Sequence, residues 1–507
     1  MALSDVTVNK STSGLGRSLP NNDHISALVF YSDATLPSGF SSSARIKTVY
    51  SLADAVALGI TNTHLGETKS TATWAASAAG AVGDVVKITC ATIQGTVTLC
   101  NYTMVTGDTA TTTTVATALK NAINALTYVH GFTATSSTNT LTIIATPGQG
   151  VFLNTGTPYT VTITGTVAGT LTQNVIAGVA SDIDILYYHV KRFFARQPKG
   201  KLYIDIEATA DVGTFSKVTT LQNNAQGEII QAGTYYKSTA HTSAHLTTMQ
   251  SILTALETNK KPMAGMIMQG DYSAVTDWSL EPNLHLLSNA NVQACIAQDG
   301  AGDGYVLWKA TGKTIGAVGE LLGTYALAKV NENPGWVGKF PLVDTEFDTI
   351  ALANGDAYLS LSDGLIDNLN SYGYVFFRKL VGKSGSYWNG SFTAVATTSD
   401  YSKFNNNRTI TKAVKNTRAI LLDALNSPIK VNADGTLSDD VIGYFKGLCK
   451  QAIDPMMRDD EISAYDVIIN PAQNVLSTGK LAVTIKIVPV GDAEFIEVNI
   501  GFTISLS

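Results

Sequence analysis

Charged residues are scarce in this chain of 507 residues. Asp, Glu, Lys and Arg make up 15% of it, against about 25% in typical soluble proteins. The formal net charge is −6 and no block of six like charges occurs, so the composition does not indicate a surface for DNA or RNA. Hydrophobic residues make up an ordinary 45% of the chain, which argues against intrinsic disorder.

Long hydrophobic runs and cysteines are also lacking. No run of 18 apolar residues exists, so we expect no membrane span. The first six residues lack the basic and apolar regions of a secretory signal. We interpret the four cysteines as buried thiols in a reducing cytoplasm, although two of them could face each other across a hairpin. They are Cys90, Cys100, Cys295 and Cys449, and the possible pair is Cys90 with Cys100.

The sequence holds no complete catalytic or metal-binding motif. Residues 310–314 resemble the end of a phosphate-binding loop, but Leu307 stands where that motif needs glycine. We therefore interpret this segment as the start of a helix after a loop. His241 and His245 have the spacing of a zinc protease, but Thr242 replaces its glutamate, so we expect a surface pair. No Gly-x-Ser-x-Gly segment is present. We therefore predict no catalytic residues, no metal ligands, no cofactor and no enzymatic activity.

Helices and strands alternate along most of the chain. Helix Asp182–Arg196 is followed by strand Leu202–Ile206, and helix Thr242–Thr258 by strand Ala264–Met268. A helix at Val212–Asn224 and a strand at Glu228–Ala232 are expected between them. This alternation predicts a mostly parallel sheet covered on both faces, in an α/β domain formed by residues 24–65 and 181–395.

The composition changes within residues 66–180. These 115 residues contain six charged residues and 30 threonines. Alternating strands and a helix at Val115–Leu126 predict a β-rich module inserted into the α/β domain, since Thr-rich strands suit half-solvated pleated surfaces.

Residues 396–507 predict a separate C-terminal domain with two long helices and a terminal hairpin. The helices are expected near Arg408–Asn426 and Ser438–Met457. Ile410 to Leu425 supply an apolar stripe on the first helix, which we expect to be buried, and Lys or Arg residues line its other side. The hairpin would join Leu481–Ile487 to Glu494–Leu506 across a turn at residues 489–492.

The last strand alternates apolar and polar residues to within one residue of the end. A chain end with this pattern needs a sheet to join, in its own subunit or in another. Residues 1–23 read as a second arm with a short alternation. We predict that both arms add strands to neighbouring subunits. The candidate inter-subunit residues are Val6, Val8, Ile496, Val498, Ile500, Phe502 and Ile504.

Several short segments follow one another in a distinctive order along the chain. They include Leu15-Gly-Arg17, Asp23-His-Ile-Ser-Ala-Leu-Val-Phe-Tyr31, Ser51-Leu-Ala-Asp-Ala-Val-Ala-Leu-Gly59, Leu186-Tyr-Tyr-His-Val-Lys-Arg-Phe-Phe194, Val330-Asn-Glu-Asn-Pro-Gly-Trp336, Asn406-Asn-Arg408, Asp454-Pro-Met-Met457, Asn470-Pro-Ala-Gln-Asn-Val-Leu-Ser-Thr478 and Ile487-Val-Pro-Val490. By their joint order, these segments resemble contractile phage tail sheath proteins of the Mu-like and Bacteroidetes-phage type.

The resemblance implies a sheath-type α/β core with an inserted β-rich module and extended arms, α+β over the whole chain. It implies a structural subunit that stacks in hexameric rings around a tail tube and contracts to drive the tube through a cell envelope. Its partners would be itself, the tube protein, and baseplate and tail-terminator proteins, with no nucleic acid or membrane. Its place would be the virion tail or an injection particle, assembled in the bacterial host cytoplasm.

Charged side chains suit a sheath–tube contact that must later release. The candidate tube-facing residues are Arg408, Lys412, Lys415, Arg418, Lys446 and Lys450. Two other functions remain open at this stage: a cell-surface or carbohydrate-binding β-rich protein, and an α/β hydrolase.

Overall fold

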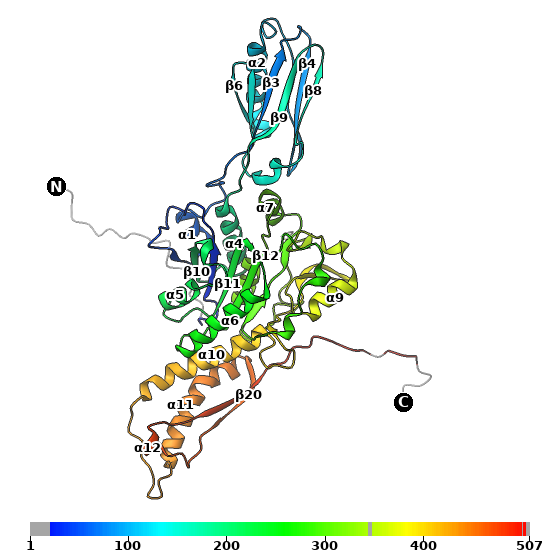
Figure 1. Cartoon of the computed structure of the whole chain (residues 1–507). Helices are drawn as coiled ribbons and strands as arrows, with labels where there is room; N and C mark the ends of the chain where they lie inside the picture. Colours follow the sequence, from blue (N-terminus) through cyan, green and yellow to red (C-terminus); the bar gives the residue numbers. More distant parts are fainter. Residues whose placement is uncertain (1–20, 343–346, 499, 503–507) are drawn as a thin grey trace, which may run out of the picture.

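The computed structural model describes residues 21–342, 347–498 and 500–502. The fold is mixed α/β, as predicted. A central α/β body carries a Thr-rich lobe at one end, formed by residues 66–180 (Figure 1). At the other end lies the C-terminal unit, residues 404–489, from which a tail, residues 490–502, extends away (Figure 1).

A six-stranded sheet forms the centre of the body. Its strand order is β14-β12-β11-β1-β10-β2, and all neighbours pair in parallel except β2, which runs antiparallel to β10 at the edge. Strand β1 is buried along its whole length, as expected for a parallel strand covered on both faces. The strands are β1 (Ser26–Tyr31), β2 (Ile46–Val49), β10 (Leu202–Glu207), β11 (Gln231–Ala240), β12 (Gly265–Asp271) and β14 (Val292–Ala294).

Helices cover both faces of this sheet, as the alternation predicted. Helices α4 and α8 pack together over one face, while α5 and α6 lie on the other (Figure 1). Their bounds are α4 (Asp182–Arg196), α5 (Lys217–Asn224), α6 (Ser243–Thr258) and α8 (Val318–Leu327), with the short α1 (Leu52–Ala57) near α4.

The helix predicted from Val212 and the strand predicted from Glu228 are both present, but each begins later in the structure than predicted. The Asp211 carboxylate accepts the backbone N–H groups of Ser216 at 3.0 Å and Lys217 at 3.2 Å, so α5 begins only after that cap. Strand β11 begins at Gln231, where it pairs with Ser26 of β1.

Shorter elements complete the body beside the main sheet. Besides β14 and α8, the described part of residues 288–395 adds small two-stranded sheets and two further helices. These elements are β13 (Ser288–Asn289) with β19 (Ala394–Val395), β15 (Ala297–Asp299) with β16 (Ile350–Leu352), β17 (Phe377–Leu380) with β18 (Lys383–Trp388), and helices α7 (Asp303–Thr311) and α9 (Asp363–Ser371).

The Thr-rich lobe has a hydrophobic core of its own, between a four-stranded sheet (β6-β7-β3-β9), a three-stranded sheet (β5-β4-β8) and helix α2. Thr111 and Thr114 form a capping box at the start of α2, which lies close to the predicted position. The elements are β3 (Thr71–Ala78), β4 (Val85–Thr92), β5 (Gly95–Thr103), α2 (Thr112–Ala125), α3 (Thr127–His130), β6 (Thr133–Ser137), β7 (Thr140–Ile144), β8 (Tyr159–Thr164) and β9 (Ala168–Ile176).

The two chain crossings between body and lobe are held together. Thr68 and Val179 exchange backbone hydrogen bonds of 3.0 and 2.8 Å. All four cysteines are free and buried, as expected; Cys90 lies opposite Val97, so it does not face Cys100.

The C-terminal unit contains the two predicted long helices, but the predicted terminal hairpin is wrong. Strand β21 pairs with β20, and the described residues after Pro489 form no strand. The chain turns away because Asp492 is bound to Lys403. The elements are α10 (Phe404–Leu421), α11 (Asp439–Arg458), β20 (Ile462–Ile468), α12 (Val475–Thr478) and β21 (Thr484–Pro489).

Candidate functional site

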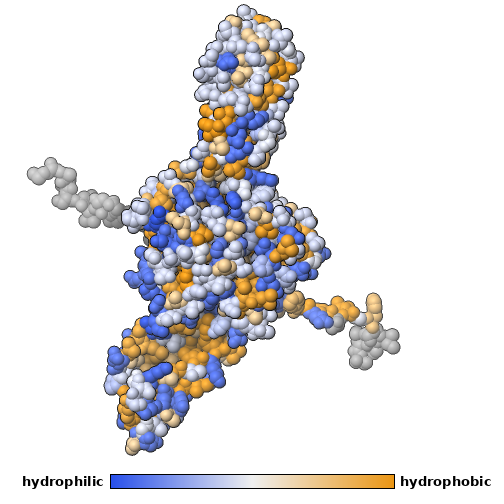
Figure 2. Space-filling view, viewed as in Figure 1, coloured by the Kyte–Doolittle hydropathy of each residue, from blue (hydrophilic) through white to orange (hydrophobic). Residues whose placement is uncertain are grey.

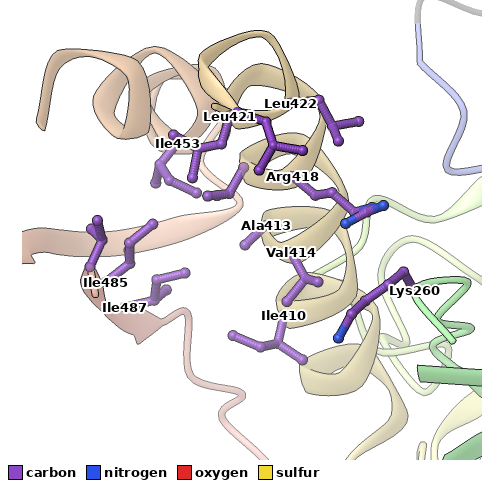
Figure 3. A pocket seen from close by; sticks show the side chains of 13 residues that line it. Lys260, Ile410, Ala413, Val414, Arg418, Leu421, Leu422, Ile453, Ile485 and Ile487 are labelled. Carbon is purple, nitrogen blue, oxygen red and sulfur yellow. The ribbon is translucent and has the colours of Figure 1, made fainter. Parts of the chain in front are cut away.

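An apolar groove opens on the surface of the C-terminal unit (Figure 3). It encloses about 550 Å³ and lies between α10, the end of α11 and strand β21. Its lining is formed mainly by the apolar stripe of α10 and by the inward side chains of β21, which point toward each other in Figure 3. The apolar lining residues are Ile410, Ala413, Val414, Leu421, Leu422, Leu425, Ile453, Val483, Ile485 and Ile487.

The groove is open because the stripe of α10 is only partly covered. The C-terminal unit buries two small clusters of apolar side chains, one around Ile453 and one around Phe445. The stripe was predicted to be buried, yet Val414 is 42% and Leu425 70% exposed. Apolar side chains that line an open concave surface are typical of an interaction site.

Two cations lie at the edge of the groove. Lys260, from the turn after α6, and Arg418 of α10 both line it (Figure 3). Among the described residues no carboxylate forms an ion pair with either of them. The groove therefore combines an apolar floor with a positively charged rim.

Three of the predicted tube-facing residues point into their own chain, so the expectation that this side of α10 is exposed is wrong for them. Arg408 is 0% exposed, and its Nε donates to Gln231 Oε1 at 3.1 Å. Lys412 forms ion pairs with Asp23 and Glu461 at 2.7 and 2.6 Å. These acceptors are far away in sequence, and α10 turns its polar side to them.

Lys415 is the third of these residues. Its ammonium donates to the carbonyl oxygens of Gly227 at 2.9 Å and Ile229 at 3.0 Å. Burial lowers the pKa of Lys415 to about 8. The side chain joins α10 to the body instead of facing solvent.

The remaining candidates have no such anchoring. Arg418 lies at the groove rim, and Lys446 and Lys450 lie on α11 with no ion pair among the described residues. A tube-facing role for these three stays a prediction.

The tail exposes its apolar side chains. Phe495, Ile496, Val498, Ile500 and Phe502 are each between 69% and 111% exposed. Figure 2 shows hydrophobic residues gathered over the C-terminal unit and along the described part of the tail. None of these side chains lines the groove of the same chain. The other predicted arm residues, Val6, Val8 and Ile504, lie outside the described residues.

The ribbon of β20 and β21 has free edges among the described residues. It is a sheet of only two strands, in which Ile485 and Ile487 turn toward the groove and Thr484, Lys486 and Val488 turn outward. A two-stranded sheet is marginal by itself, and an added strand could pair with either edge.

The motifs considered as catalytic lie in structural positions. Gly312 ends α7 with φ +64°, so residues 310–314 close a helix instead of starting one as expected. His241 and His245 are not a surface pair: the Nδ1 of each lies 2.8 Å from the Tyr236 hydroxyl, and burial lowers the pKa of His241 to about 3.

The described residues contain no group of three potential metal ligands. None of their helices is both long and apolar enough to cross a membrane.

Two family models together match almost the whole chain. The N-terminal domain model of DUF2586 matches residues 3–391, and its C-terminal domain model matches residues 400–507. The chain belongs to the DUF2586 family. No curated protein matches the chain.

Several solved structures resemble this DUF2586 protein. The anti-feeding prophage helical sheath in its contracted state is 15% identical, with 63% of this chain and 81% of that chain covered and a TM-score of 0.44. A chain of the contracted anti-feeding prophage baseplate is 13% identical over 100% and 99%, with a TM-score of 0.44. The sheath tail protein from Desulfitobacterium hafniense is 13% identical over 96% and 100%, with a TM-score of 0.36.

These structures are of sheath and baseplate proteins.

The sequence patterns indicated the tail and strand β21. They did not indicate that Lys260 lies at the edge of the groove or that β20 pairs with β21. The alternation of Leu481 to Ile487 marked one wall of the groove. Lys260 lies in a turn of the body, and no local pattern connects it to α10. In strand β20 only Ile462 and Val467 are buried, and Tyr465 is half-buried. Its apolar residues therefore do not alternate regularly, and the sequence did not predict this strand.

Proposed function

We propose that this DUF2586 protein is the structural subunit of a contractile sheath. Copies polymerise around a tube and contract to drive it through a target envelope. The observation that carries the proposal is that one chain holds both an open apolar groove and an exposed apolar tail, and that the two do not meet within a single copy.

The chemistry of the groove suits the tail of a second copy. An extended strand laid along β21 would pair with its free backbone groups and turn alternate side chains into the groove. Burial of each Ile or Phe side chain contributes about 1.5–3 kcal/mol. Glu497 in the tail complements the positive rim of Lys260 and Arg418.

Exchange of tails joins different surfaces of identical subunits. Such a contact is heterologous and gives an open helical assembly when it does not close into a ring. The N-terminal segment, with Val6 and Val8, is proposed as a second link of the same kind. Two such links would hold subunits together while they move during contraction.

The proposed domains are an N-terminal arm (1–23), an α/β sheath domain (24–65 and 181–395), an inserted β module (66–180) and a C-terminal domain (396–507). The proposed partners are further copies in stacked rings, a tube protein, and baseplate and terminator proteins. The particle would be a virion tail or an injection machine assembled in the bacterial cytoplasm, without enzymatic chemistry.

Electron microscopy of the purified full-length chain tests the proposal. We expect rings or tubes as the protein concentration rises. A folded protein that stays monomeric over a wide range of concentration and salt would overturn it.

A further inference from the structure

We propose that residues 403–412, the start of α10, set the directions in which both terminal segments leave the body. This α10 anchor rests on the proposed function for its purpose, since the directions matter when the segments must reach neighbouring copies. The contacts themselves belong to the single chain.

The tail is bound to the anchor just before its exposed apolar part begins. Lys403 Nζ lies 3.3 Å from Asp492 Oδ2 and 2.8 Å from Glu494 Oε1. The side-chain amides of Asn333 and Asn405 donate to the same Asp492 oxygen at 3.2 and 3.5 Å. Phe495, which directly follows Glu494, is 90% exposed.

The N-terminal segment is bound to the same helix two turns further on. Lys412 Nζ lies 2.7 Å from Asp23 Oδ2, and Arg408 donates to the Asp23 carbonyl oxygen at 3.4 Å. Asp23 is buried only two residues after the described chain begins. The described chain therefore begins next to a residue that α10 holds in place.

The anchor is itself fixed to the body. Arg408 donates to the carbonyl oxygens of Ala328 and Lys329, and Asn405 to that of Asn331. Lys403 and Lys412 are nine residues apart, about 14 Å or two and a half turns along a helix at 1.5 Å per residue. A pull on either terminal segment therefore acts on the same short stretch of helix, and α10 connects the two links that the proposed assembly would use.

The contacts of Lys403 fix the direction of the tail more than they stabilise the folded chain. Partly exposed ion pairs contribute little to folding, so Lys403→Ala should leave the chain folded. What it should lose is both ion pairs, so that Glu494 is released and Asp492 is held only by the amides of Asn333 and Asn405. We expect the tail to lose its fixed course as a result.

Spin-label distances in dilute, monomeric full-length protein test the tail side. The native cysteines are buried, so labels can be placed on Thr258→Cys in α6 and Val498→Cys in the tail. We expect the width of the distance distribution to at least double in Lys403→Ala, to recover in Lys403→Arg, and to stay unchanged in Lys199→Ala, an exposed lysine outside the anchor. An unchanged distribution in Lys403→Ala would overturn the inference.

A second label pair tests the N-terminal side. With labels at Asn21→Cys and Thr258→Cys, Asp23→Asn should broaden the distribution because the ion pair with Lys412 is lost. The same width with and without the Asp23 charge would contradict that half of the inference. Because single copies are measured, these outcomes do not depend on polymerisation; absence of tubes in the unaltered protein would count only against the proposed function.

Discussion

The Thr-rich lobe and the C-terminal unit differ in how they cover their apolar side chains. In the lobe, two sheets and α2 enclose a core that includes Trp74, Leu119 and Phe132, all buried. In the C-terminal unit, two helices and a two-stranded ribbon leave a groove of about 550 Å³. The lobe covers its apolar side chains with its own elements, whereas the C-terminal unit leaves part of them open in the groove. In the proposed assembly, the groove is therefore the place where another chain would bind.

The largest expected effect comes from the tail. Ile500→Asp with Phe502→Asp should remove two buried side chains from the contact between copies, each contributing about 1.5–3 kcal/mol. The concentration needed for polymers should rise at least about 100-fold, since 1.4 kcal/mol is a factor of ten. Sedimentation and electron microscopy measure this.

Leu359→Asp is the matched control, because Leu359 is also an exposed apolar residue but lies on the body. It should polymerise as the unaltered chain does. Normal tubes from the doubly substituted tail would contradict the role of the tail.

A smaller effect is expected from the groove. Val414→Asp places a charge in the apolar lining of the groove, and its side chain is already 42% exposed, so the single chain should fold. We expect polymerisation to weaken about tenfold or more, as measured by the critical concentration. Val381→Asp, at an exposed position on the body, is the control. Equal behaviour of the two variants would show that the groove is not used.

The attachment of the C-terminal unit to the body should depend on pH. The pKa of Lys415 is lowered to about 8 by burial, while an unfolded lysine titrates near 10.4. Below pH 8 both states hold the proton, and the cost of burying the charge is fully present. Between pH 8 and about 10.4 the folded state releases it first, so the free energy of unfolding gains up to about 1.4 kcal/mol per pH unit.

Denaturant unfolding at pH 7.5 and 9.5 measures this gain against Lys415→Met, which cannot titrate. The unaltered protein should gain stability relative to the variant as the pH rises. A constant difference between the two proteins would show that the buried ammonium is not strained by desolvation.

The smallest effect on assembly is expected from the lobe. Replacing residues 66–180 by a short linker should leave polymerisation within about twofold, because the two chain crossings into the lobe lie side by side and the lobe has its own core. The isolated segment should fold, with a cooperative thermal transition. Loss of all polymers from a deletion variant whose body stays folded would show that the lobe takes part in assembly.

Local periodicity predicted much of the fold. Helices α4 and α6 were placed within a residue of their ends, and the alternation of buried strands with helices indicated the parallel sheet. These elements bury one continuous face or run, so their spacing in the sequence reports their environment.

The relations between distant segments were not predictable in this way. The apolar stripe and the basic side of α10 were both visible in the sequence. Which of the two sides faces the body depends on Asp23, Glu461 and the carbonyl oxygens of Gly227 and Ile229. All of these residues are far from α10 in sequence. The hairpin prediction failed for a similar reason: residues 489–492 have turn composition, but Asp492 is held by Lys403, and β21 finds its partner upstream.

Photo-cross-linking tests the central claim most directly. Phe502 is replaced by benzoylphenylalanine in unlabelled protein, which is mixed with ¹⁵N-labelled protein under assembly conditions and irradiated. Mass spectrometry then identifies the residues joined and the copy from which each comes. The account predicts cross-links from the unlabelled tail to α10 or β21 of a labelled copy. Cross-links confined to the groove of the same copy, or to surfaces away from the groove, would contradict it.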